Sequence, residues 1–106
     1  MIISGGVNIY PAEVEAALHA HPAVQDAAVI GVPDEHWGES VKAVVQLRSG
    51  ATTMDSELVA FCADRLADYK RPRSIDFVEE LPRDAAGKLL KRRIREPYWT
   101  QAGRRI

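Results

Sequence analysis

A lysine at position 88 ends a short turn-forming segment whose residue types suit it to deliver a positive charge to another surface. Residues 81–88 read LPRDAAGK. Pro82 fixes one backbone dihedral angle, and Gly87 permits a tight turn directly before the lysine. Asp84, followed by two alanines, adds the side-chain chemistry of a turn. We therefore predict an exposed loop that carries Lys88 on a long stem, although a plain polar loop before a basic helix has the same pattern.

The composition is that of an ordinary globular chain. With 106 residues, of which 46% are hydrophobic and 27% charged, one domain with a modest core is expected, and disorder is not indicated. No apolar run approaches the roughly 20 residues that cross a bilayer, and no signal-peptide pattern is present. Cys62 is the single cysteine, which excludes an internal disulfide and suits a reducing compartment. We predict a cytoplasmic protein without a transmembrane segment.

The charges are unevenly placed along the chain. Residues 1–50 carry six acids and two bases, whereas residues 51–106 carry nine acids and twelve bases. The basic excess, most of which follows Arg83, suits a polyanionic partner such as a nucleotide, or alternatively forms a solvated helix face. Nucleic acid is not predicted as a partner, because the aromatic residues do not interleave with the bases as a stacking platform requires.

Hydrophobic periodicity and turn residues predict an α+β fold. We expect a small, mainly antiparallel three-stranded sheet flanked by helices, with a separate N-terminal β-hairpin whose turn contains Gly5 and Gly6. Pro97 is expected to stop the last helix and leave a frayed tail at residues 98–106. The predicted strands of the sheet are residues 24–32, 41–47 and 75–78, and the predicted helices are residues 11–21, about 54–69 and 89–95.

Two residues with potential metal or nucleophilic chemistry fit structural roles better. His21 lies where the first helix ends before Pro22, a position more typical of a helix end than of a metal ligand. Cys62 falls on the apolar face of the second helix, which indicates a buried thiol of the core and not a nucleophile. No metal site is predicted.

Three sequence blocks, in this order and spacing, resemble the small C-terminal domain of the adenylate-forming enzymes, the acyl-CoA synthetase and luciferase superfamily. They are SGGVNIYPAEVE at residues 4–15, GVPDEHWGE at residues 31–39, and the segment from YKRP to GK at residues 69–88. The first block looks most like bacterial synthetases that act on fatty or aryl acids. Val7 occupies a variable position of the family, and the family's hinge residue would lie immediately before Met1.

The resemblance implies an activity for the full-length enzyme. It would activate a carboxylic acid, expected to be a fatty acid, with ATP and Mg2+ to an acyl-adenylate, and transfer the acyl group to coenzyme A. Lys88 would be the lysine that enters the active site for the first half-reaction. Ser4, Gly5 and Gly6 would line the pantetheine passage for the second, since glycine allows close backbone approach to a thin ligand. The two glycines equally suit a plain hairpin turn.

The resemblance also implies a partner. Residues 1–106 would form the mobile C-terminal domain, and its partner would be the large N-terminal AMP-binding domain, which is not part of this sequence. The isolated domain is therefore expected to be inactive and to hold no cofactor by itself. Two alternatives stay open: a stand-alone domain that docks on a partner synthetase, and an acyl-adenylate ligase that does not use coenzyme A. Four bases beyond the lysine loop suit either coenzyme A phosphates or a solvated helix: Lys91, Arg92, Arg93 and Arg95.

Overall fold

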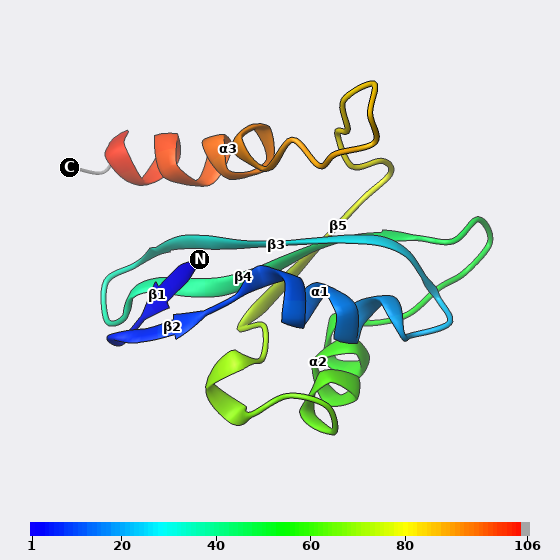
Figure 1. Ribbon diagram of the computed structural model, residues 1–106, viewed down its shortest axis with the longest axis horizontal. Coiled ribbons are helices and arrows are strands. Elements are labelled where there is room, and N and C mark those ends of the chain that lie inside the picture. The colour runs from blue at the N-terminus through cyan, green and yellow to red at the C-terminus, as the bar shows by residue number, and fades with distance from the viewer. Residues whose placement is uncertain (105–106) are drawn as a thin grey trace.

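A mainly antiparallel sheet with helices on both faces organises the chain (Figure 1). The computed structural model describes residues 1–104, and no helix in that range is long and apolar enough to cross a membrane. Helix α3 covers one face of the sheet, and α1 and α2 lie on the other (Figure 1). The elements are β1 (Ile2–Ser4), β2 (Val7–Ile9), α1 (Pro11–His19), β3 (Val24–Asp34), β4 (Gly38–Leu47), α2 (Asp55–Ala63), the 3-10 turn η1 (Asp68–Lys70), β5 (Ser74–Val78) and α3 (Lys91–Arg104).

Strand β4 is the centre of the sheet. It pairs antiparallel with β3 along nearly its whole length and parallel with β5. The hairpin β1–β2, which the sequence predicts as a separate unit, joins the same sheet through a single pair, Ser4 with Gly38. Within residues 1–104 the three predicted strands and the hairpin therefore form one five-stranded sheet. The predicted α+β class, with its mainly antiparallel sheet, is confirmed.

The long apolar stretch of β3 is explained by burial on both faces. Because side chains alternate along a strand, Ala27 and Val29 contact the core beneath α1 and α2, whereas Ala28 and Ile30 belong to the smaller core beneath α3. A strand covered on both sides has no need of alternating polar residues. Consequently β3 is a rigid element to which neighbouring loops can be attached.

Helix α1 begins at Pro11, as expected for proline at the first helical position, and buries Val14 and Leu18. It ends at His19, two residues before the predicted end at His21. The buried His21 ring contacts α2, because its Nε2 lies 3.0 Å from the Glu57 carboxylate. Its Nδ1 accepts a hydrogen bond from a backbone N–H at 3.1 Å. His21 thus links the end of α1 to α2.

The predicted end of the second helix is wrong. Helix α2 ends at Ala63, and Tyr69, which was expected on its buried face, lies in η1 with 46% of its surface exposed. Cys62, in contrast, is fully buried as predicted, and this burial raises the pKa of its thiol. After Ala63 the chain closes one further turn, in which the N–H groups of Arg65 and Leu66 donate to the Cys62 carbonyl at 3.0 and 2.9 Å.

Helix α3 does not stop at Pro97 but continues to Arg104. Proline inside a helix costs about 3 kcal/mol, because it removes a hydrogen bond and crowds the preceding turn. Contacts beyond the proline offset this cost: the Tyr98 hydroxyl donates to Asp76, and the Trp99 indole N–H donates to the Gly31 carbonyl at 2.9 Å. Burial and the Asp76 carboxylate raise the pKa of Tyr98 to about 12. Residues 105–106 of the predicted frayed tail lie outside the described residues.

Candidate functional site

The loop that carries Lys88 is a tight structure held by its own backbone. Residues 81–90 fold back on themselves, with a bridge between Arg83 and Leu89 and a hydrogen bond from the Leu90 N–H to the Pro82 carbonyl at 3.0 Å. Gly87 has a φ of +86°, a region that glycine adopts without strain. The predicted turn immediately before Lys88 is therefore confirmed.

Asp84 fixes the shape of this loop. Its carboxylate oxygen Oδ1 accepts hydrogen bonds from the N–H groups of Ala86 and Lys88, both at 2.9 Å. Its carbonyl accepts from the Gly87 N–H, and its own N–H donates to the Lys88 carbonyl, again at 2.9 Å each. One aspartate thus satisfies most of the backbone of the turn, which is the local chemistry that its residue type predicts.

Lys88 differs from the other lysines of the chain. Lys42, Lys70 and Lys91 each form an ion pair with an acid of this domain at 3.0 Å or less. The side chain of Lys88 is exposed, and it makes no hydrogen bond or ion pair with the side chains that the structure describes, those of residues 1–100. It therefore presents a positive charge that remains available to a group outside the domain.

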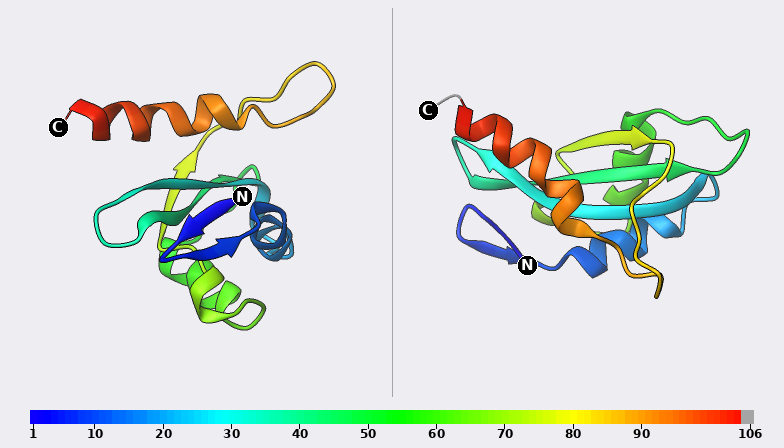
Figure 2. Two further views of the ribbon diagram at one scale, coloured as in Figure 1. Left: turned by 60° about the vertical axis from the view of Figure 1, so that its left-hand side comes forward. Right: turned by 90° about the horizontal axis from the view of Figure 1, so that it is seen from above.

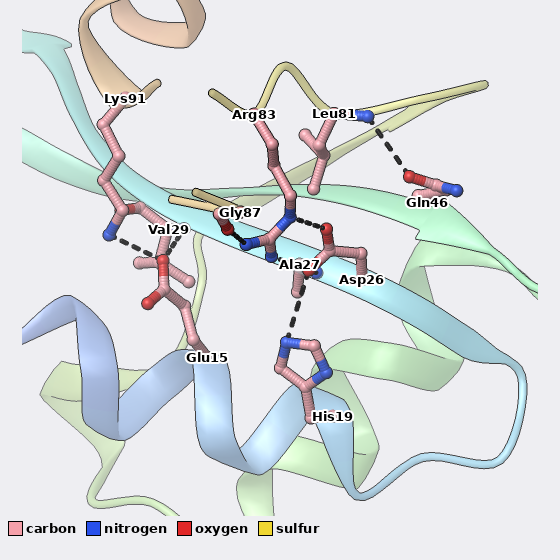
Figure 3. Close-up of polar contacts among 10 residues, drawn as sticks. All are labelled: Glu15, His19, Asp26, Ala27, Val29, Gln46, Leu81, Arg83, Gly87 and Lys91. Atoms are coloured by element: carbon pink, nitrogen blue, oxygen red, sulfur yellow. Dashed lines mark hydrogen bonds and ion pairs between the residues drawn. The ribbon is translucent and has the colours of Figure 1, made fainter. Parts of the chain in front are cut away.

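Arg83 ties the loop to strand β3. Its Nε and Nη2 atoms donate to the two carboxylate oxygens of Asp26 at 2.9 and 2.7 Å, a bidentate arrangement (Figure 3). The remaining arm of the guanidinium donates to the carbonyl of Gly87, inside the Lys88 loop. Burial by itself would raise the pKa of the Asp26 carboxyl. The hydrogen bonds from Arg83 and the Ala27 N–H, with the charge of Arg83, outweigh burial and hold that pKa below its ordinary value.

A second ion pair involves a residue that follows Lys88 in the chain, as Arg83 precedes it. Lys91 Nζ is 2.6 Å from Glu15 of α1 and donates to the Val29 carbonyl of β3 at 3.2 Å (Figure 3). Lys91 is therefore engaged within the domain, unlike Arg92 and Arg93, which are exposed on α3. The sequence pattern grouped these bases together as candidates for binding phosphate, and it gave no sign that Lys91 pairs with Glu15 inside the domain.

The Gly5–Gly6 turn is a different kind of site. Both glycines have positive φ, +57° and +81°, as the tight hairpin turn predicted from the sequence requires. The Gly5 N–H donates to the Trp37 carbonyl at 2.9 Å, and a Cβ added to Gly5 would lie only 2.7 Å from the Trp37 indole. Gly6 has open space around it. The turn therefore presents bare backbone at Gly6, while Gly5 is packed against an aromatic ring.

The structure does not bring the two candidate sites together. The Lys88 loop, which precedes α3, projects past the N-terminal end of that helix. The turn of the β1–β2 hairpin lies toward the opposite end of the molecule in all the views of Figures 1 and 2. Ser4, which pairs with Gly38 at the start of β4, belongs to the hairpin. A partner that used both sites in one active centre would have to meet the domain in two orientations.

Comparison with known proteins places the chain in a family. It matches the model of the AMP-binding enzyme C-terminal domain over residues 13–88. The chain therefore belongs to this family, the C-terminal domains of adenylate-forming enzymes, and the resemblance inferred from the three sequence blocks is confirmed.

Proteins similar to this chain include coenzyme A ligases. The chain is 55% identical over 95 residues to a 2-succinylbenzoate–CoA ligase of Geobacillus kaustophilus, covering 90% of the chain and 19% of that protein. It is 53% identical over 96 residues to a long-chain-fatty-acid–CoA ligase of Bacillus subtilis, covering 91% of the chain and 17% of that protein. A fatty acyl CoA synthetase structure from Mycobacterium tuberculosis superposes with a TM-score of 0.87 at 44% identity, covering 95% of the chain and 20% of that protein. The chain thus spans about a fifth of the length of these relatives.

Proposed function

We propose that this chain is the C-terminal domain of an acid–thiol ligase. The full-length ligase activates a carboxylic acid, expected to be a fatty acid, with ATP and Mg2+ to an acyl-adenylate, releases pyrophosphate, and transfers the acyl group to the thiol of coenzyme A. Support comes from the family, and from relatives whose names describe CoA ligases of fatty and aromatic acids.

The exposed lysine on its ordered loop is the observation that carries the proposal. When the substrate carboxylate attacks the α-phosphate of ATP, two anions approach and negative charge grows on the oxygens between them. A cation held at that point offsets the repulsion and stabilises the transition state. Lys88 suits this task because no described side chain of residues 1–100 engages its charge and because Asp84 fixes its backbone. The lysine would enter the active site for adenylation.

The Gly5–Gly6 turn suits the second half-reaction. Open space at Gly6 leaves room for the thin pantetheine arm, and exposed backbone amides can donate hydrogen bonds to it. Ser4 would border the same passage. Because this turn lies away from the Lys88 loop, the domain would rotate between the two half-reactions, with its two faces used in turn (Figure 2).

The partner of this domain would be the N-terminal AMP-binding domain of the same ligase. The relatives of this chain are about five to six times as long as the segment that they share with it, because that segment covers 19% and 17% of their lengths. ATP, Mg2+ and coenzyme A would bind mainly to that domain or between the two, with none held by residues 1–106 alone. We further propose a cytoplasmic location, where ATP and coenzyme A are supplied.

The test uses the full-length ligase with Lys88→Ala. ATP–pyrophosphate exchange reports adenylation, and thioester formation from supplied acyl-adenylate reports the second step. We expect exchange to fall about 100- to 1,000-fold, as for removal of other groups that stabilise developing charge, while the second step keeps its rate. Arg48→Ala, which removes an exposed base far along the chain from the loop, is the control. Normal exchange in Lys88→Ala would remove the proposed function of this lysine.

A further inference from the structure

We propose that Arg83 and Lys91 are positioning residues, which clamp the Lys88 loop to the body of the domain from both sides. Arg83 precedes the lysine and pairs with Asp26 of β3, and Lys91 follows it and pairs with Glu15 of α1 (Figure 3). This inference rests on the function proposed above for Lys88. It assigns to two ion pairs the task of aiming that lysine.

Both clamps end on rigid parts of the structure. Asp26 and Glu15 have only 13% and 16% of their side chains exposed, so each carboxylate is itself held in place. Glu15 also accepts a hydrogen bond from the Val29 N–H at 2.8 Å, which joins α1 to the buried strand β3. The two anchoring acids are therefore fixed relative to one another through β3.

The loop needs these clamps because its own bonds set only its shape. The hydrogen bonds around Asp84 close the turn but do not connect it to the sheet. Residues 83–88 are all exposed; Leu81 before them is buried, and Leu89 directly after Lys88 is partly buried against the core beneath α3. These two leucines anchor the ends of the loop, and the contacts of Arg83 with β3 and of Lys91 with α1 add polar restraints on where the turn points.

The exact position of the Lys88 side chain should affect the rate of adenylation more than it affects the stability of the fold. A displacement of about 1 Å at a reacting centre can lower a rate about 100-fold. Partly exposed ion pairs such as these contribute little to the stability of a fold. Loss of the Arg83 pair should therefore slow adenylation far more than it destabilises the domain, and this separation distinguishes positioning from a merely structural role.

The first experiment changes the Arg83 pair in the full-length ligase. We expect Arg83→Gln and Asp26→Asn each to lower the kcat of ATP–pyrophosphate exchange about 10- to 100-fold. The KM for ATP, the thioester step from supplied acyl-adenylate and the melting temperature should stay near those of the parent. Partial recovery is expected in Arg83→Lys, which keeps the charge but loses the bidentate geometry.

Matched controls address charge and amide substitution in general. Arg48→Gln removes an exposed arginine from the turn after β4, and Glu57→Gln removes the negative charge from the contact between α2 and His21, away from the loop. Both should leave exchange unchanged. A loss of exchange in Arg83→Gln that is matched by an equal loss in Glu57→Gln would overturn the inference, because it would show a general response to damage.

The second experiment asks whether Arg83 acts through Lys88. In the Lys88→Ala background, Arg83→Gln should have no further effect on the residual exchange rate, and Arg83→Gln with Asp26→Asn should be no slower than either alone. An undiminished effect of Arg83→Gln without the lysine would overturn the inference. Loss of exchange in Lys88→Ala but not in Arg83→Gln would refute the clamp and leave the proposed function standing. Unchanged exchange in Lys88→Ala would refute both.

Discussion

The Lys88 loop and the Gly5–Gly6 turn are both exposed turns that require glycine at positive φ, yet they are built in opposite ways. The lysine loop is held by side chains: Asp84 shapes it, and Arg83 connects it to β3. The hairpin turn is held by backbone pairing and by the packing of Gly5 against Trp37. This difference fits the roles proposed for the two turns: polar side chains would position a charged group, and a turn that borders a passage would have to keep side chains out.

The largest effect that would sharpen this comparison is expected from Asp84→Ala. The substitution removes the carboxylate that accepts the Ala86 and Lys88 N–H groups, so the lysine would sample many directions. Adenylation should fall about 10- to 100-fold, measured as ATP–pyrophosphate exchange, with the thioester step unchanged. Asp84→Asn keeps an acceptor oxygen and should recover much of the rate. Equal losses in the alanine and asparagine variants would contradict the shaping role of this carboxylate.

An intermediate effect, on stability, is expected at the hairpin. Gly5→Ala places a side chain at positive φ, which costs about 1–2 kcal/mol, and also forces the Trp37 ring to move from a Cβ 2.7 Å away. Gly50→Ala is the matched control, since Gly50 has a φ of +77° but open space around it. Urea denaturation should therefore show a larger loss in unfolding free energy for Gly5→Ala. Equal losses of unfolding free energy in the two variants would mean that the Trp37 ring moves aside without a free-energy cost, and they would contradict the packing role of Gly5.

The smallest effect concerns pH and tests the Asp26 anchor. The folded-state pKa of Asp26 lies below its ordinary value of 3.8. The stability that its pairing contributes is therefore present above the unfolded-state pKa and is lost as the pH falls through the lower folded-state pKa. Arg83 and, when protonated, His19 are the charged groups that face it. Unfolding free energy measured from pH 7 to about pH 3 should fall less steeply in Asp26→Asn. An unchanged slope would contradict the pairing.

The local parts of both sites follow from sequence, because they depend on residues close together in the chain. Asp84 and Gly87 specify the lysine turn, and Gly5 and Gly6 specify the hairpin. The pairing of Arg83 with Asp26 joins residues 57 positions apart, so no local pattern contains it. Long-range acid–base pairs of this kind are visible only once the sheet has placed β3 beside the loop.

The same distinction explains the errors in the fold. Strands β3 and β4 carry their own patterns of β-branched residues, and their antiparallel pairing follows from the short turn between them. Strand β5 instead pairs parallel with β4 across a connection that contains α2. Pro97 is a strong local signal to stop a helix, but Tyr98 and Trp99 bond to Asp76 and Gly31 on the sheet. These tertiary contacts outweigh the local preference, and a single sequence gives no means of weighing them in advance.

The most direct test of the account is to measure both half-reactions in two variants of the full-length ligase, Lys88→Ala and Gly6→Asn. Asparagine tolerates positive φ, so Gly6→Asn adds a side chain to the open turn with little backbone strain, and Gly50→Asn is its control. The account predicts opposite patterns: Lys88→Ala slows adenylation alone, and Gly6→Asn slows thioester formation alone. If both variants slowed the same half-reaction, the division of labour between the two sides of this domain would be contradicted.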